Sequence, residues 1–243
     1  MEQRLELVPM AAIQQRAAAY EPRDFASALR GERLAVIAEV KQRTPRVGVL
    51  TADYSPAALV ASYEQGGASA ISVLTHQAAF GGLLGDLDAV RASTKLPILR
   101  KDFITDAYQV VEARAHGADA VLLIVAAMDA NGLDMLLWWA RQSGLAALVE
   151  VHDEAEVKTA VRAGARIIGV NHRDLNTFDV DLTLTERLRP HVPDGVLLVA
   201  ESGIHGPADA RRMREAGADA VLVGELLMRS ADPGATIKAL VSA

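Results

Sequence analysis

Residues 217–224 read GADAVLVG, and residues 117–124 read GADAVLLI. Two looser copies, GASAISVL at residues 67–74 and GARIIGVN at residues 164–171, follow the same plan. Each copy comes after a polar, alanine-rich segment of helical period, such as PADARRMREA before Gly217. A glycine in this place is typical of a left-handed helix C-cap, and the apolar run after it is typical of a buried strand. The repeated unit is therefore a helix, a glycine cap and a strand.

Further apolar runs without the Gly-Ala opening bring the number of predicted strands to eight. The runs begin at Leu34, Ser69, Leu96, Asp119, Leu145, Arg166, Val196 and Asp219. Helical segments separate every pair, and this strict alternation predicts right-handed crossovers and a parallel sheet. Eight units in about 250 residues favour a closed (β/α)8 TIM barrel over an open doubly wound sheet, which would have about six strands.

The chain is expected to form one barrel domain over residues 1–243. Its length suits one such barrel, and no linker rich in Pro, Gly and Ser divides it. Residues 1–33 come before the first predicted strand and are expected to add a short N-terminal extension of one or two helices.

Composition excludes several classes of function. The formal net charge of -6 and the scattered basic residues argue against a nucleic-acid partner. The sequence has no cysteine, so disulfides and thiolate chemistry are excluded. Apolar runs fall short of the ~20 residues that a membrane span needs, and the N-terminus does not resemble a secretory signal. We expect a soluble, cytoplasmic protein that does not bind membranes, as a monomer or a weak homo-oligomer.

Polar residues end five of the predicted strands, where the active site of such a barrel lies. They are Glu39 with Lys41, Lys101, Glu150, Asn171, and Glu201 followed by Ser202. A single charge at a strand end is usually a solvated rim residue or half of an ion pair. Three Glu, two Lys and one Asn at one mouth are different, because their nearly balanced charges allow mutual pairing and coupled proton affinities. Burying so many charges without a function would cost stability, so the cluster predicts an active site.

The segments after the last two strands predict a phosphate site. Ser202 and Gly203 follow the seventh strand, and Gly224 follows the eighth directly before a helix. Glycines let backbone N–H groups approach an anion, and a helix N-terminus adds its dipole.

A metal centre is not expected. His152 lies two positions after Glu150, and His172 follows Asn171, but no spacing of three or four ligands supports a site. Trp138 and Trp139 are expected to bury against the barrel from a helix.

Several motifs together resemble those of the indole-3-glycerol phosphate synthase family. They are AEVKQRTP, SVLTHQAAFGG, LPILRKDFI, GADAVLLIVAA, LVEVHDEAE, IIGVNHRDL, VAESGI and VLVGELLMR, in this order from about Leu34 to the C-terminus. The resemblance implies a carboxy-lyase of tryptophan biosynthesis that cyclises 1-(2-carboxyphenylamino)-1-deoxyribulose 5-phosphate without a metal or organic cofactor.

The resemblance also implies residue roles. Lys101 matches the general acid of ring closure, Lys41 a second lysine near the substrate carboxylate, Glu150 the base, and Glu39 a second catalytic carboxylate. Asn171, Glu201 and Ser202 match positions that hold the sugar-derived chain. The matching substrate-binding positions are Thr44, Gly203 and Gly224 towards the phosphate, Phe80, Phe103, Leu122 and Leu175 around the aromatic ring, Arg173 beside the carboxylates, and Glu225.

The chain departs from the family pattern in the loop after the first strand, where Thr44, Pro45, Arg46, Val47 and Gly48 stand in place of the usual Ser-Pro-Ser-x-Gly. It also departs at His172, whose bulk could narrow the site. The extension before the first strand is also shorter than usual. Three other functions stay open: a paralogue acting on a modified anthranilate-derived substrate, a sugar-phosphate isomerase such as phosphoribosylanthranilate isomerase, and a non-catalytic phosphometabolite-binding barrel. The absence of cysteine weighs against the isomerase, and the two lysines weigh against the binding protein.

Overall fold

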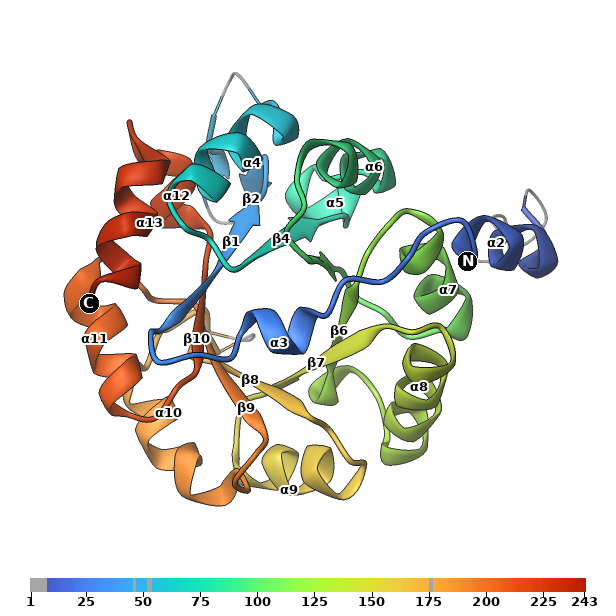
Figure 1. The fold of residues 1–243 in the computed structure, drawn as a ribbon. Coiled ribbons are helices and arrows are strands. Elements are labelled where there is room, and N and C mark those ends of the chain that lie inside the picture. The colour runs from blue at the N-terminus through green and yellow to red at the C-terminus, as the bar shows by residue number, and fades with distance from the viewer. Residues whose placement is uncertain (1–7, 46, 52–53, 175–176) are drawn as a thin grey trace.

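Eight parallel strands close into a barrel in the computed structural model, which describes residues 8–45, 47–51, 54–174 and 177–243 (Figure 1). In chain order the strands are β1 (Ala35–Val40), β4 (Ala70–Leu74), β5 (Ile98–Lys101), β6 (Ala120–Ile124), β7 (Ala146–Val151), β8 (Ile167–Asn171), β9 (Leu197–Glu201) and β10 (Ala220–Val223). Each pairs with its neighbour in sequence, and β10 returns to β1. All eight predicted strands are therefore present, and the TIM barrel is confirmed.

The helices between the strands surround the barrel (Figure 1). They are α4 (Pro56–Gln65), α5 (Gln77–Phe80), α6 (Leu84–Ser93), α7 (Ala107–Ala115), α8 (Ala130–Gln142), α9 (Glu154–Arg162), α10 (Thr183–Leu188), α11 (Pro207–Glu215), α12 (Glu225–Arg229) and α13 (Pro233–Val241), with short 3-10 turns at Val125–Ala127 and Arg189–His191.

The repeated glycines end helices as the sequence predicts. Gly67, Gly117, Gly164 and Gly217 have φ angles of 89°, 80°, 77° and 87°. The alanine after each glycine donates its N–H to a carbonyl five residues earlier, as Ala218 does to Met213 at 3.0 Å. This is the hydrogen bond of a Schellman motif, and it turns the chain sharply from the helix into the next strand.

The aspartate of the two GAD copies fixes the start of the neighbouring strand. In the later copy, the Asp219 carboxylate accepts a hydrogen bond of 2.7 Å from the N–H of Leu198, and the Asp219 N–H donates to the Leu198 carbonyl at 2.8 Å. Asp119 makes the same reciprocal pair with Ile98. The repeat therefore encodes both a helix end and a strand junction.

The barrel interior has a core of its own, formed by inward-facing residues such as Leu99, Leu148 and Val199. Phe25 and Leu29 belong to this core, and they come from the segment containing α3 (Phe25–Ala28), which lies across the barrel in Figure 1. The other face of each strand packs against the surrounding helices in a second, larger core. The alternation inferred from the sequence is thus confirmed.

The N-terminal extension contains α2 (Met10–Ala17) and α3 within the described residues. α2 packs on α7 through Ile13 and Ala17. Trp139 contacts this cluster, but Trp138 is 51% exposed, so the prediction that both tryptophans are buried is wrong for Trp138.

A short antiparallel hairpin was not expected from the sequence. It consists of β2 (Arg43–Thr44) and β3 (Gly48–Val49), and it follows β1 at the C-terminal end of the barrel. Among the described residues, no helix combines the length and the apolar character needed to cross a membrane.

Replacing Asp219 by Ala is expected to destabilise the fold by about 1–3 kcal/mol, because the buried N–H of Leu198 loses its side-chain acceptor. Urea unfolding measures the change. Arg166→Ala is the matched control, since Arg166 occupies the same position in another copy and is exposed; its effect should stay within about 0.5 kcal/mol. Equal effects of the two substitutions would contradict a role for Asp219 at the strand junction.

Candidate active site

The polar residues predicted at the strand ends come together at one end of the barrel. Glu39 lies on β1, Lys101 ends β5, Glu150 is on β7, and Asn171 and Glu201 end β8 and β9. The three carboxylates are almost fully buried, with exposures of 3%, 1% and 1% for Glu39, Glu150 and Glu201. Their side chains continue the inward-facing rows of the barrel core, so the apolar interior ends in a charged layer.

Lys101 lies between two of the carboxylates. Its Nζ is 3.4 Å from Oε2 of Glu150 and 3.1 Å from Oε2 of Glu201. The Nδ2 of Asn171 donates a hydrogen bond of 3.1 Å to Oε1 of Glu150, and Ser202 donates its hydroxyl to Asn171 Oδ1 at 2.8 Å. Five of the seven predicted catalytic residues thus form one connected group.

The other two form a separate ion pair at the end of β1, where Lys41 is the first residue after the strand. Lys41 Nζ lies 2.6 Å from Glu39 Oε1, and both side chains are mostly buried. The charged layer therefore contains two ammonium groups, each in contact with at least one carboxylate. A charge-assisted pair of this kind can hold or move a proton in a site with little water.

These contacts change proton affinities in opposite directions. Burial by itself would lower the pKa of Lys101, but the charges of Glu201, Glu150 and Glu39 raise it well above its usual range. Burial and the charge of Glu150 raise the pKa of Glu201, although Lys101 opposes them. The pKa of Glu150 is lowered, because Lys101, His152 and Asn171 outweigh its burial. Two neighbouring carboxyl groups thus differ in protonation, a pattern that is common where acid and base roles are divided.

Two glycines make room for the carboxylates. A Cβ atom on Gly169 of β8 would overlap Oε1 of Glu201, and a Cβ atom on Gly224 would overlap Oε1 of Glu39 and come within 2.8 Å of Lys41 Nζ. Any other residue at these positions would displace a charged group from the site.

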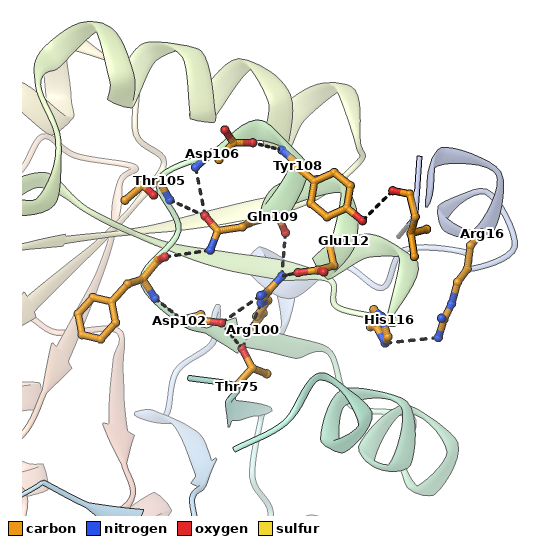
Figure 2. Close-up of polar contacts among 12 residues, drawn as sticks. Arg16, Thr75, Arg100, Asp102, Thr105, Asp106, Tyr108, Gln109, Glu112 and His116 are labelled. Atoms are coloured by element: carbon orange, nitrogen blue, oxygen red, sulfur yellow. Dashed lines mark hydrogen bonds and ion pairs between the residues drawn. The ribbon is translucent and has the colours of Figure 1, made fainter. Parts of the chain in front are cut away.

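A second buried network holds the strand that carries Lys101 (Figure 2). Arg100, whose side chain points away from the barrel interior, forms ion pairs of 3.0 Å with Asp102 and Glu112. Its Nε donates to the hydroxyl of Thr75 at 3.1 Å, and that hydroxyl donates to Asp102 at 2.6 Å. These bonds connect the ends of β4 and β5 to α7, so the backbone on both sides of Lys101 is fixed.

The residues implied for binding the aromatic part of a ligand lie at different depths. Phe103 is 43% exposed and contacts the ring of His76 edge to face at 5.1 Å. Phe80 ends the short helix α5, and Leu122 is buried within the barrel core. Leu175 lies outside the described residues.

The loops after β9 and β10 have the backbone forms expected of an anion site. Ser202 and Gly203 both have positive φ angles, of 67° and 79°, and Gly224 precedes α12. Glu225 begins that helix, but its carboxylate pairs with Arg229 at 3.1 Å on the surface.

Thr44 and Arg173 are engaged within their own loops. The Thr44 hydroxyl accepts a hydrogen bond from the Val47 N–H at 3.1 Å, and the guanidinium of Arg173 donates to the Phe178 carbonyl at 3.2 Å. Of the departures in this loop, Val47 is 45% exposed, and Arg46 lies outside the described residues.

His172 does not narrow the site, contrary to the expectation from its bulk. It follows Asn171, so its side chain points to the opposite face of the strand, where it is 2% exposed. Its Nδ1 donates to the Ser202 carbonyl at 2.9 Å, and its Nε2 lies 2.7 Å from the Thr185 hydroxyl. His172 therefore stabilises the backbone at Ser202 from the face of the strand that points away from the barrel interior.

Sequence reasoning missed two contributors to the charged layer. Ser72 faces the interior from β4, and its buried hydroxyl has no hydrogen-bond partner among the described residues. The alternation of β4 could have revealed it. His152 was considered only as a metal ligand, but it contacts Glu150 instead. Within the described parts of the chain, no three His, Cys, Asp or Glu residues gather in a way that could hold a metal ion.

Comparison with known proteins gives consistent results. The family model described as indole-3-glycerol phosphate synthase matches residues 1–240. The chain is 59% identical over 225 residues to indole-3-glycerol phosphate synthase 2 of Streptomyces coelicolor, covering 93% of this chain and 87% of that protein. It is 54% identical to indole-3-glycerol phosphate synthase of Parafrankia sp., covering all of this chain and 87% of that protein.

Solved structures with similar folds are more distant in sequence. Thiamine phosphate pyrophosphorylase from Pyrococcus furiosus aligns with a TM-score of 0.64 at 21% identity, over 85% of this chain and 93% of that one. N-acetylmannosamine-6-phosphate 2-epimerase from Clostridium perfringens aligns with a TM-score of 0.65 at 16% identity, over 85% and 92%. These similarities show the fold alone.

Glu201→Gln is expected to become more stable relative to the parent protein as the pH rises from 5 to 8. Burial raises the pKa of Glu201 to about 7, so the folded state favours its protonated form. The protonated carboxyl group stabilises the folded parent protein fully below the ordinary pKa of a carboxyl group, and this stabilisation is lost as the pH rises through 7. Gln stays neutral, so the variant does not lose it. Urea unfolding at both pH values should show the difference between the proteins change by about 1–3 kcal/mol. A difference that is constant with pH would contradict the raised pKa.

Proposed function

The chain belongs to the indole-3-glycerol phosphate synthase family, and from this premise we propose how the residues of the charged layer divide the reaction. The enzyme is a carboxy-lyase of tryptophan biosynthesis. It converts 1-(2-carboxyphenylamino)-1-deoxyribulose 5-phosphate to indole-3-glycerol phosphate, carbon dioxide and water. One new carbon–carbon bond forms, between the ring carbon that bears the carboxylate and the ketone carbon.

Lys101 is the general acid of ring closure. As the ring carbon attacks the ketone, the ketone oxygen gains negative charge and must receive a proton. The observation that carries the assignment is the position of the Lys101 ammonium group, 3.4 Å and 3.1 Å from the carboxylates of Glu150 and Glu201. These carboxylates keep Lys101 charged before the substrate arrives, so a proton is available at the ketone oxygen.

Decarboxylation follows ring closure and needs no external electron acceptor. The electron pair of the breaking carbon–carbon bond flows into the iminium that ring closure created, and aromaticity is restored. Because the electrons balance within the substrate, we propose that the enzyme works without a metal or organic cofactor.

Glu150 is the base of the final dehydration. The hydroxyl group formed from the ketone receives a proton from the ammonium group of Lys41 and leaves as water, and a proton leaves the neighbouring carbon to complete the indole. The low proton affinity of Glu150 in the free enzyme means that it is ionised and can accept this proton. Glu39 and Lys41 form the second acid–base pair, with Lys41 towards the substrate carboxylate.

The substrate has a charged end and an aromatic end, and the site accommodates both. The phosphate binds at Gly203, Gly224 and the start of α12, with Thr44 contributing its hydroxyl. Asn171, Glu201 and Ser202 hold the sugar-derived chain. The Glu201 Oε1 atom has no hydrogen-bond partner among the described residues, which leaves it free to accept one from a substrate hydroxyl group. We further propose that the enzyme acts in the cytoplasm as a monomer or a weak homo-oligomer.

Purified protein is expected to convert the carboxyphenylamino-deoxyribulose phosphate to a fluorescent indole product without added metal. The rate should be unchanged by EDTA, because no step requires a metal ion. Fluorescence at the indole wavelength follows the product directly. Tight binding of the substrate without turnover would contradict the assignment and favour a binding protein.

Lys101→Ala is expected to lower kcat by about a hundredfold or more, the usual contribution of a general acid. Steady-state assays measure the loss, and Lys95→Ala is the matched control, since Lys95 is an exposed lysine just before the same strand. Unaltered turnover in Lys101→Ala would remove this lysine from the mechanism.

A further inference from the structure

His152 connects the buried base to a second carboxylate near the surface. Its Nε2 lies 3.4 Å from Oε1 of Glu150, and its Nδ1 lies 3.1 Å from Oε2 of Glu156. The His152 side chain is 17% exposed and that of Glu156 18%, whereas that of Glu150 is 2% exposed. The three side chains therefore form a row that leads from the interior of the site towards solvent.

The start of α9 fixes Glu156 in this row. The Glu156 N–H donates to the Asp153 carboxylate at 2.8 Å, which caps the helix. The Glu156 carboxylate in turn accepts a hydrogen bond of 2.7 Å from the backbone N–H of His152. Helix capping thus sets the position of the group that orients the imidazole ring.

Carboxylates near both ring nitrogens favour the imidazolium form, in which each nitrogen carries a proton. Nδ1 is within hydrogen-bond distance of Glu156, and Nε2 makes an ion-pair contact with Glu150. Burial opposes this charge, but the contacts with the carboxylates of Glu150 and Glu156 outweigh it and raise the pKa of His152 to about 10. His152 is then a second cation on Glu150, on the opposite oxygen from Lys101.

We propose that His152 is a positioning residue for Glu150. His152, as an imidazolium held by Glu156, keeps Glu150 ionised and correctly oriented through the catalytic cycle. This inference rests on the proposed role of Glu150 as the base.

The chemistry of the cycle explains why a second cation is needed. Lys101 gives up its proton to the ketone oxygen during ring closure, so its positive charge no longer stabilises Glu150 when dehydration begins. Among the described residues, the other groups that face Glu150 include Asn171, which is neutral, and Glu201, whose carboxylate form disfavours the ionised form of Glu150. Of the described residues that contact Glu150, His152 alone keeps a positive charge at that stage.

The pH dependence of kcat tests the proposal, because kcat reports the ionisation of groups in the substrate complex, where Lys101 gives up its proton. In His152→Gln, the acidic limb should move to higher pH by about 1 unit or more, because Glu150 is protonated more easily without the imidazolium. On the acidic side of the limb, where turnover falls as Glu150 is protonated, a shift of about 1 unit lowers kcat about tenfold relative to the parent protein at the same pH. Glu156→Gln should shift the limb in the same direction by a smaller amount. His191→Gln is the matched control, since His191 also pairs with a glutamate of α9, Glu154, at 3.4 Å. The pH profile of this variant should be unchanged.

A merely structural role would lower activity equally at all pH values, and that result in both folded variants would overturn the proposal.

A second measurement does not depend on catalysis. Imidazole 15N chemical shifts of His152 should report the imidazolium at pH 8 in the parent protein and a more easily deprotonated ring in Glu156→Gln; a neutral ring at pH 7 would overturn the proposal.

Comparison with Glu150→Gln separates this inference from the assignment of the base. If Glu150→Gln abolishes turnover while His152→Gln leaves the limb unchanged, Glu150 remains the base and the role of His152 fails. If Glu150→Gln keeps full activity, the assignment of the base fails, and with it the catalytic role of His152.

Discussion

The burial of three carboxylates at one end of an apolar barrel depends on two ammonium groups placed among them. Lys101 contacts Glu150 and Glu201, and Lys41 contacts Glu39. Without these cations the carboxylates would be protonated or drawn towards water, because an unpaired buried charge costs several kcal/mol. The alternate strands β5, β7 and β9 supply Lys101 and its two carboxylate partners at fixed positions, since parallel register brings the end of each strand to the same mouth. Closure of the barrel and assembly of the charged layer therefore depend on the same backbone pairing.

Much of this arrangement could be predicted from the sequence because it repeats. Four Gly-Ala units marked four helix ends, and eight apolar runs marked eight strands. The side-chain alternation of a strand then fixed which terminal residues face the interior, so Glu39, Lys101, Glu150, Asn171 and Glu201 could all be placed at one mouth. Periodicity of this kind is a local property, so it can be seen in the order of the residues without knowledge of contacts between distant segments.

Other features could not be predicted because they depend on contacts between distant segments. The hairpin of β2 and β3 has only two residues in each strand, too few for a periodic signal. The ion pairs of Arg100 join residues of β5, the loop after it and α7, and nothing in the motif itself indicates which side chains meet. His172 was misplaced for a different reason. The size of His172 was considered, but not the face on which it lies. Side chains alternate between faces along a strand, so the residue after Asn171 points away from the barrel interior.

Gly224 illustrates how closely the two parts of the site are joined. One side of its backbone faces Glu39 and Lys41, so closely that no side chain fits there. Its other neighbour along the chain is the first turn of α12, where the phosphate is proposed to bind. The same residue therefore borders both the acid–base pair and the proposed phosphate position, so a substitution at Gly224 would disturb both at once.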